Sequence, residues 1–154
     1  MLPEIKPERT PKAIKASIFV VMDKEGSILY ETRPDSDEYL GGYNIFPGGK
    51  AEKEETSFTT LTREFEEETG AKITKCYFLG NFDNSDYRGR LYNDSVYLIT
   101  SWEGKIGNTE PNKGIHHWAK LEELRKLMKL DLSLKILTMT EEFISSEKAR
   151  LKRD

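Results

Sequence analysis

The feature that most constrains this chain is an amphipathic helix predicted over residues 54–70, shortly after a proline–glycine–glycine turn. Phe58, Leu61 and Phe65 recur at helical spacing and form an apolar face, and a glycine closes the pattern. Four glutamates crowd into residues 64–68, where like charges three or four positions apart repel each other. The apolar face of the helix therefore requires a core to cover it, and the repulsion among the glutamates requires an explanation.

Three of these acids share one face of the predicted helix. At about 100° per residue, Glu64, Glu67 and Glu68 border the apolar face, whereas Glu66 points elsewhere. Carboxylates at the edge of a core repel each other and are partly desolvated, and a divalent cation removes both conflicts. The alternative is a solvated acidic face, which most charge runs are. The position beside the core favours the cation, as does the preceding turn, whose backbone carbonyls can approach a metal.

The rest of the chain mixes strand and helix patterns. Its 154 residues are the usual size of one domain. We expect a loose leader over residues 1–11, which hold three prolines, and a single domain over residues 12–154. Strands, of which the first two suggest a hairpin, are predicted at 13–23, 27–33, 44–46, 72–82, 94–102 and 116–121, and further helices at 121–128 and 132–150. This order predicts an α/β fold with a mixed sheet covered on its faces by helices.

Charge and composition argue against several partners. The net charge is -3, so a broad basic surface for duplex nucleic acid is not expected. No apolar run approaches the roughly 20 residues of a membrane helix, and the N-terminus has acids and prolines where a signal peptide has an apolar core. One cysteine, Cys76, cannot form an internal disulfide. We therefore expect no membrane association and a cytoplasmic location.

A longer motif surrounds the acidic cluster within residues 49–71. Its fixed positions are Gly49, Glu55, Arg63, Glu64, Glu67, Glu68 and Gly70. This segment resembles the signature of the Nudix hydrolases, with small departures at Phe65, which is aromatic, and at Ala71, which is small. The order of elements along nearly the whole chain also resembles a Nudix domain, in which a mixed β-sheet is sandwiched between α-helices.

The resemblance implies a metal site. Glu64, Glu67 and Glu68 resemble the ligands of a divalent cation, Mg²⁺ with Mn²⁺ as a substitute, and the carbonyl of Gly48 resembles an additional ligand. Glu67 and Glu68 are also candidates for the general base that accepts a proton from the attacking water. Net acidity is no obstacle to binding phosphates, because bound metal ions reverse the local charge.

Three further residues receive roles from the resemblance. Arg63 and Glu55 resemble a structural pair in which the glutamate orients the arginine and the arginine holds the carboxylates; the alternative is an ordinary surface ion pair. In MutT-type members, a loop glutamate eight residues after a tryptophan reaches the metals. Glu110 follows Trp102 at that spacing and is a candidate ligand or general base, or else a glutamate in solvent.

Other residues are candidates for substrate binding or for packing. Phe46 would wall a nucleobase pocket or fill the core. Arg33 and Lys50 would contact phosphates or be surface charges. His116 and His117 are adjacent in a predicted strand and point to opposite faces, so they cannot form a metal site together and are assigned to structure.

The predicted reaction is Mg²⁺-dependent hydrolysis of a phosphoanhydride bond in a nucleoside diphosphate linked to a group X. The favoured version converts a nucleoside or deoxynucleoside triphosphate to the monophosphate and pyrophosphate. Alternatives are a nucleotide-sugar, ADP-ribose or dinucleoside-polyphosphate hydrolase, or a non-catalytic nucleotide-binding regulator. Members that act on oxidised dGTP read the base with an asparagine near the start of the last helix, where this chain has Asp131 and Ser133. This departure argues against that specific substrate.

Overall fold

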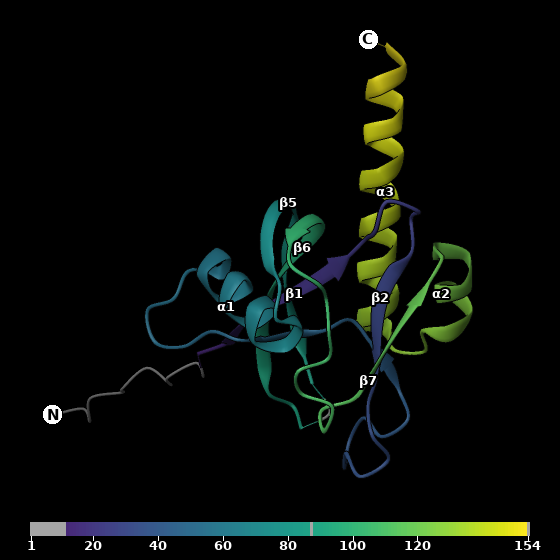
Figure 1. The fold of residues 1–154 in the computed structure, drawn as a ribbon. Helices are drawn as coiled ribbons and strands as arrows, with labels where there is room; N and C mark the ends of the chain where they lie inside the picture. Colours follow the sequence, from purple (N-terminus) through teal and green to yellow (C-terminus); the bar gives the residue numbers. More distant parts are fainter. Residues whose placement is uncertain (1–11, 87, 154) are drawn as a thin grey trace, which may run out of the picture.

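The computed structural model describes residues 12–86 and 88–153, and the predicted leader over residues 1–11 lies outside this part of the chain. The described residues form two sheets and three helices (Figure 1). The four-stranded sheet has the order β4 (Gly48–Lys50), β1 (Ile14–Val21), β6 (Leu91–Glu103) and β5 (Lys72–Ser85). The three-stranded sheet has the order β3 (Asn44–Ile45), β2 (Ile28–Thr32) and β7 (Ile115–Ala119). The helices are α1 (Ser57–Thr69), α2 (Leu121–Leu127) and α3 (Asp131–Arg153).

Strand β1 is central to the larger sheet, which is mixed as predicted. It pairs antiparallel with β4 and parallel with β6. Its buried residues, Ile18–Val21, alternate between two core clusters. One cluster contains Leu61 and Phe65 of α1, and the other contains Leu124 of α2 and Ile136 of α3. The helices therefore cover opposite faces of the sheet, and Figure 1 shows α1 and α3 on its two sides.

The predicted hairpin between the first two strands is wrong. A turn over residues 23–27 does reverse the chain, but β1 and β2 share only the isolated bridge between Met22 and Ile28. Beyond it, β1 pairs with β6 and β2 pairs with β7, so the two strands belong to different sheets. The turn signal is local, whereas the choice of partner depends on which apolar strands lie alongside, and these come from distant parts of the chain.

Helix α1 ends where its sequence indicates but begins at Ser57, three residues after the predicted start. The side chain of Thr56 accepts a hydrogen bond from the Thr59 backbone amide (3.1 Å), which caps the first turn. Gly70 ends the helix with a φ of 78°, a left-handed conformation that glycine adopts readily. The prediction that Phe58 belongs to the buried face is wrong, because this residue is 51% exposed, with its ring centroid 6.4 Å from that of Tyr97 on β6.

Strands β5 and β6 run further than predicted, to Ser85 and from Leu91 respectively. The intervening turn is held by Asp86, whose carboxylate accepts hydrogen bonds from the backbone amides of Arg88 and Arg90 (2.9 Å each) and from the Arg90 side chain (2.7 Å). The two strands thus extend beyond the core and form one wall of a cavity.

The C-terminal helix α3 follows its predicted bounds closely. Ile136 and Leu137 pack against the sheet and the exposed face is polar. Among the described residues, no helix combines the length and the apolar character needed to cross a membrane.

Candidate active site

Arg63 ties the acids of α1 to the loop that precedes the helix. Its guanidinium donates hydrogen bonds to both carboxylate oxygens of Glu55 (2.8 and 2.9 Å) and to the carbonyl of Lys50 (3.0 Å). It also donates to the carboxylates of Glu64 (2.8 Å) and Glu67 (3.2 Å). The hydrogen bonds from Arg63 lower the pKa of Glu55 to about 2, and the same contacts raise the pKa of Arg63. The pair is therefore a bidentate link within a network, not an isolated surface ion pair.

The two glycines of β4 allow the acidic face of α1 to approach the sheet. A Cβ atom on Gly49 would lie 2.0 Å from the carboxyl carbon of Glu64, and one on Gly48 would lie 2.4 Å from the carbonyl oxygen of Ser17. Both distances are far below any normal contact. The Glu64 carboxylate can therefore pack on the backbone of β4 only because residue 49 has no side chain.

Glu68 is the most deeply buried of the three predicted metal ligands. It is 5% exposed, and its Oε2 atom has no hydrogen-bond partner among the described residues. Burial, followed by the neighbouring charge of Glu31, raises the pKa of Glu68 to about 8, while Lys113 opposes the shift. The ionised carboxylate is therefore costly at this position unless a cation lies close to it.

Glu31 on β2 belongs to the site but was missed by the sequence analysis. It is 4% exposed and contacts Arg33 (3.2 Å) and the Nε2 atom of His116 (3.5 Å). Its carboxylate lines the same cavity as the buried acids of α1. The available signal was its strand position, since Glu31 shares a face with the buried residue Leu29.

The loop over residues 104–114 places Glu110 at the C-terminal end of α1. Two backbone amides of this loop donate hydrogen bonds to the last two carbonyls of the helix, at 2.9 and 3.1 Å. Lys113, a second residue that the sequence analysis missed, pairs with Glu110 (2.8 Å) and lies 3.6 Å from Oε1 of Glu68. Glu110 is thus close to the acids of α1, and its role as ligand or base stays a prediction.

The donor groups suit a hard divalent cation in their chemistry. Within residues 12–86 and 88–153, no three His, Cys, Asp or Glu side chains converge closely enough to form a complete metal site. Glu64 and Glu67 are turned toward Arg63, and Glu68 is turned toward Lys113. The donors are nevertheless carboxylates beside the glycines of β4, and the buried Oε2 atom of Glu68 lacks a partner among the described residues. These are the oxygen ligands that Mg²⁺ prefers.

Two cavities meet at β4. The first, here called the acidic cavity, has a volume of ≈ 540 Å³ and is lined by Glu31, Arg33, Arg63, Glu64, Glu68 and Lys113. The second, here called the sheet cavity, has a volume of ≈ 370 Å³ and is lined by Ala16, Ile18, Leu40, Phe46, Asp94 and Leu132. Residues that line both are Ile45, Gly48, Gly49 and Lys50. A ligand can therefore extend from one cavity into the other across β4.

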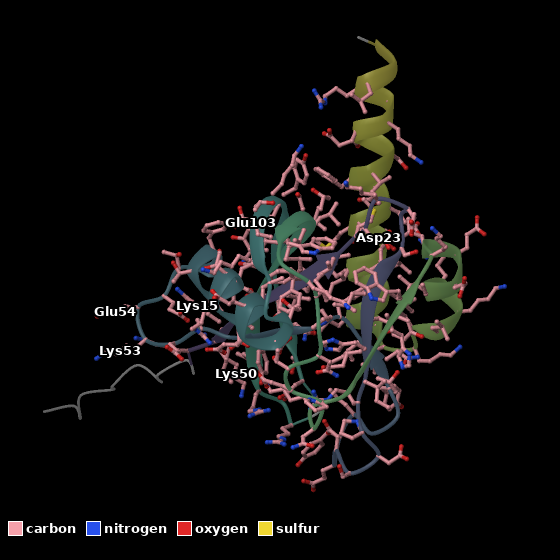
Figure 2. The ribbon with its side chains drawn as sticks, in the orientation of Figure 1. Lys15, Asp23, Lys50, Lys53, Glu54 and Glu103 are labelled. Atoms are coloured by element: carbon pink, nitrogen blue, oxygen red, sulfur yellow. The ribbon has the colours of Figure 1, made fainter. Side chains whose placement is uncertain are left out.

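The predicted substrate-binding residues lie along these two cavities. Phe46 is buried in the core and also lines the sheet cavity, so both interpretations of this residue fit its position. Arg33 lines the acidic cavity, and Lys50 lines both. Figure 2 shows Lys50 near α1, whereas Lys53 and Glu54 lie on the outer part of the preceding loop, in keeping with the absence of a role for Glu54.

Comparison with known proteins identifies the family. The NUDIX domain family matches residues 11–139. The chain is 30% identical over 106 residues to an 8-oxo-dGTP diphosphatase from Proteus vulgaris, which covers 69% of this chain and 93% of the relative. A second 8-oxo-dGTP diphosphatase, from Buchnera aphidicola, is 31% identical over 97 residues, or 63% of this chain and 71% of the relative. The fold resembles that of a MutT NUDIX hydrolase from Burkholderia pseudomallei, with a TM-score of 0.73 and 23% sequence identity. The match covers 83% of this chain and 98% of the other.

The chain therefore belongs to the Nudix family and is a hydrolase. Within the family it is similar to the MutT-type members, as the spacing of Trp102 and Glu110 indicated. The predicted fold class is confirmed as well, since the structure has mixed sheet topology with helices on both faces and resembles solved Nudix structures.

Proposed function

We propose that the protein is a Mg²⁺-dependent nucleoside triphosphate pyrophosphohydrolase that releases a nucleoside monophosphate and pyrophosphate. The observation that carries this proposal is the junction of the two cavities at β4. The acidic cavity suits the cation and the phosphates, and the largely apolar sheet cavity suits a nucleobase. The two relatives named as 8-oxo-dGTP diphosphatases support this class of substrate. A cytoplasmic location, where such nucleotides are found, is part of the proposal.

In this proposal the acids of α1 hold the cation. Glu64, Glu67, Glu68 and the Gly48 carbonyl are the expected ligands, with Mn²⁺ as a substitute for Mg²⁺. When bound, the cation neutralises phosphate charge and lowers the pKa of a coordinated water. Arg63 and Glu55 keep the carboxylates in place through the hydrogen bonds described above.

The remaining residues position the substrate and the proton acceptor. Arg33, which lines the acidic cavity, and Lys50, which lines both cavities, are the proposed phosphate contacts. Glu67, Glu68 and Glu110 are the candidates for the base that accepts the proton from the attacking water. Glu67 is half exposed and therefore accessible to a water molecule, whereas Glu110 is paired with Lys113 at 2.8 Å.

A nucleotide panel tests the proposal. Purified protein is assayed with each of the common nucleoside and deoxynucleoside triphosphates, 8-oxo-dGTP, ADP-ribose and a nucleotide sugar, with Mg²⁺, with Mn²⁺ and with a chelator. We expect metal-dependent release of pyrophosphate and a monophosphate, and hydrolysis in ¹⁸O-labelled water identifies the attacked phosphorus. Tight nucleotide binding without turnover of any substrate would instead indicate a binding regulator.

A further inference from the structure

Asp94 on β6 is a buried acid outside the catalytic cluster. It is 3% exposed, and its Oδ2 atom has no hydrogen-bond partner in the part of the chain that the structure describes. The side chain nevertheless lines the sheet cavity. Buried polar atoms are almost always paired, and beside a cavity the missing partner of this atom can come from a bound ligand.

The surrounding strands turn this carboxylate toward the space that a ligand would occupy. Asp94 lies opposite Ala16 on β1 and Phe82 on β5. Ala16 is small and leaves room above the sheet. Val96, two positions after Asp94 and on the same face of β6, packs into the core beneath α3. The carboxylate therefore lies on an apolar floor, where a hydrogen bond is stronger than in water.

The basic residues at the rim of the cavity have other contacts. Arg90 pairs with Asp86 at 2.7 Å, and the guanidinium of Arg88 lies 4.1 Å from the ring centroid of Tyr39. Neither residue forms a hydrogen bond with Asp94 among the contacts of the described residues. Asp94 thus offers an acceptor atom, Oδ2, that no group of the described residues occupies.

We propose that Asp94 determines base specificity by accepting hydrogen bonds from two adjacent N–H groups on the edge of a guanine-type base. This inference rests on the proposed function, because it requires that a nucleobase occupies the sheet cavity. Guanine presents N1–H and the N2 amino group side by side, and a carboxylate can accept from both. The base of 8-oxo-dGTP keeps the same two donors.

Other bases match this carboxylate less well. Adenine and cytosine place one donor beside a ring nitrogen acceptor, whose lone pair would face an ionised carboxylate. Hypoxanthine keeps N1–H but lacks the amino group, so it provides only one of the two hydrogen bonds. Burial raises the pKa of Asp94 to about 6, so the carboxylate is still mainly ionised at pH 7.5. The expected order of preference is therefore guanine, hypoxanthine, then adenine and cytosine.

Two measurements test this inference. The first compares kcat/KM of the wild-type protein for dGTP, dITP, dATP and dCTP at pH 7.5 with Mg²⁺. The second repeats the series with Asp94→Asn, which has the same shape but offers one donor and one acceptor. We expect the preference for dGTP over dATP to fall by about 10–100-fold in this variant, since charge-assisted hydrogen bonds are lost and the new pattern suits adenine better. The asparagine also allows dATP turnover to rise in absolute terms.

Asp83→Asn is the matched control. It makes the same chemical change on the neighbouring strand β5, but Asp83 is exposed and accepts a hydrogen bond from Asn93 on the other face of the sheet. This variant should keep the wild-type order of bases. Circular dichroism and thermal melting establish that both variants are folded.

The outcomes separate this inference from the proposed function. If no nucleoside triphosphate is hydrolysed by the wild-type protein, the proposed function fails. If the wild-type protein hydrolyses triphosphates but treats dGTP and dATP alike, or if Asp94→Asn leaves a guanine preference unchanged, the inference about Asp94 fails and the proposed function stands.

Discussion

The acidic cavity and the sheet cavity surround their buried acids with different groups. In the acidic cavity, Glu64 is bound by Arg63 and Glu68 faces Lys113, although Oε2 of Glu68 has no partner among the described residues. In the sheet cavity, the single buried carboxylate of Asp94 has no partner among the described residues. The acids of the first cavity thus lie beside cationic side chains of the protein, whereas Asp94 in the second forms no ion pair among the described residues.

This contrast separates two kinds of function within one ligand path. A dense network fixes carboxylates in position, and such preorganisation is what a reaction with highly charged phosphates requires. A single acceptor on an apolar surface contributes little to positioning the substrate. It discriminates strongly between bases that present different hydrogen-bonding patterns. We therefore expect changes in the acidic cavity to alter the rate for every nucleotide, and changes in the sheet cavity to alter the choice of nucleotide.

The largest expected effect is that of Glu67→Gln. This change removes a predicted metal ligand and candidate base, and we expect kcat to fall by roughly 100-fold or more for all nucleotides. Stability should barely change, because the side chain is half exposed and its described contact is a 3.2 Å hydrogen bond from Arg63. Steady-state kinetics and thermal melting measure the two effects.

Glu66→Gln is the control for this experiment, since Glu66 is an exposed neighbour whose one described contact is a 4.0 Å pair with Lys72. It should retain the wild-type rate. Wild-type turnover by the Glu67 variant would show that this residue is outside the catalytic machinery and would remove the contrast between the two cavities.

The two cavities also differ in how well the sequence predicted them. The acidic cavity was largely predictable, because its residues sit at fixed spacing on one helix and its preceding turn. Glu31 and Lys113 were missed, since strand pairing and a loop bring them to the helix from distant positions. Asp94 was treated only as the start of a strand, and neither its burial nor its lack of a partner can be read from its neighbours in the sequence.

The overall fold shows the same division between local and distant information. The end of α1 followed from a closing glycine, which acts within one turn. The pairing of β1 with β6 did not follow from the sequence, because many apolar strands have similar patterns and only the packed core selects among them. The incorrect hairpin is the result.

The next effect in size concerns the backbone of β4. Gly49→Ala would place a methyl group 2.0 Å from the carboxyl carbon of Glu64, so the helix or the carboxylate must move. We expect a loss of about 1–3 kcal/mol in the free energy of unfolding, together with a drop in kcat for every nucleotide. Urea denaturation and the nucleotide assay measure these effects.

Gly107→Ala provides the comparison for that variant, because its nearest contact would be an ordinary 3.7 Å from the carbonyl of Thr69. It should be close to wild type in both assays. Equal behaviour of the two glycine variants would mean that the close packing of Glu64 on β4 is unimportant.

A smaller effect is expected from Glu110→Gln. The loop glutamate is paired with Lys113, and its loss should lower kcat by about tenfold if it is a ligand or the base. The pH profile of kcat distinguishes these roles, because removing the base changes the acidic limb of the profile whereas removing a ligand changes the Mg²⁺ concentration required. An unchanged rate across pH would exclude Glu110 from the mechanism. Glu103→Gln serves as the control, because Glu103 is an exposed residue at the end of β6.

The smallest expected effect is a gain in stability at Asp94. Burial raises the pKa of this carboxyl from 3.8 to about 6, so the folded state binds its proton more tightly than the unfolded state does. Below about pH 4 the group is protonated in both states and costs nothing. As the pH rises from about 4 to 6, folding increasingly opposes ionisation, and above about pH 6 the full cost is present. That cost is at most about 3 kcal/mol.

Asp94→Asn removes the titration without changing the shape of the side chain. We expect the variant to be more stable than the wild type by about 1 kcal/mol at pH 7.5 and nearly equal to it at pH 4. The expected gain is smaller than the maximum cost of about 3 kcal/mol because the cavity opens to solvent, which screens the charge. Urea denaturation at the two pH values measures the difference, and Asp83→Asn should show no such dependence. A gain of the same size at both pH values would mean that Asp94 is not a desolvated acceptor. A gain confined to pH 7.5 would show that the sheet cavity sacrifices stability to keep an acceptor unpaired.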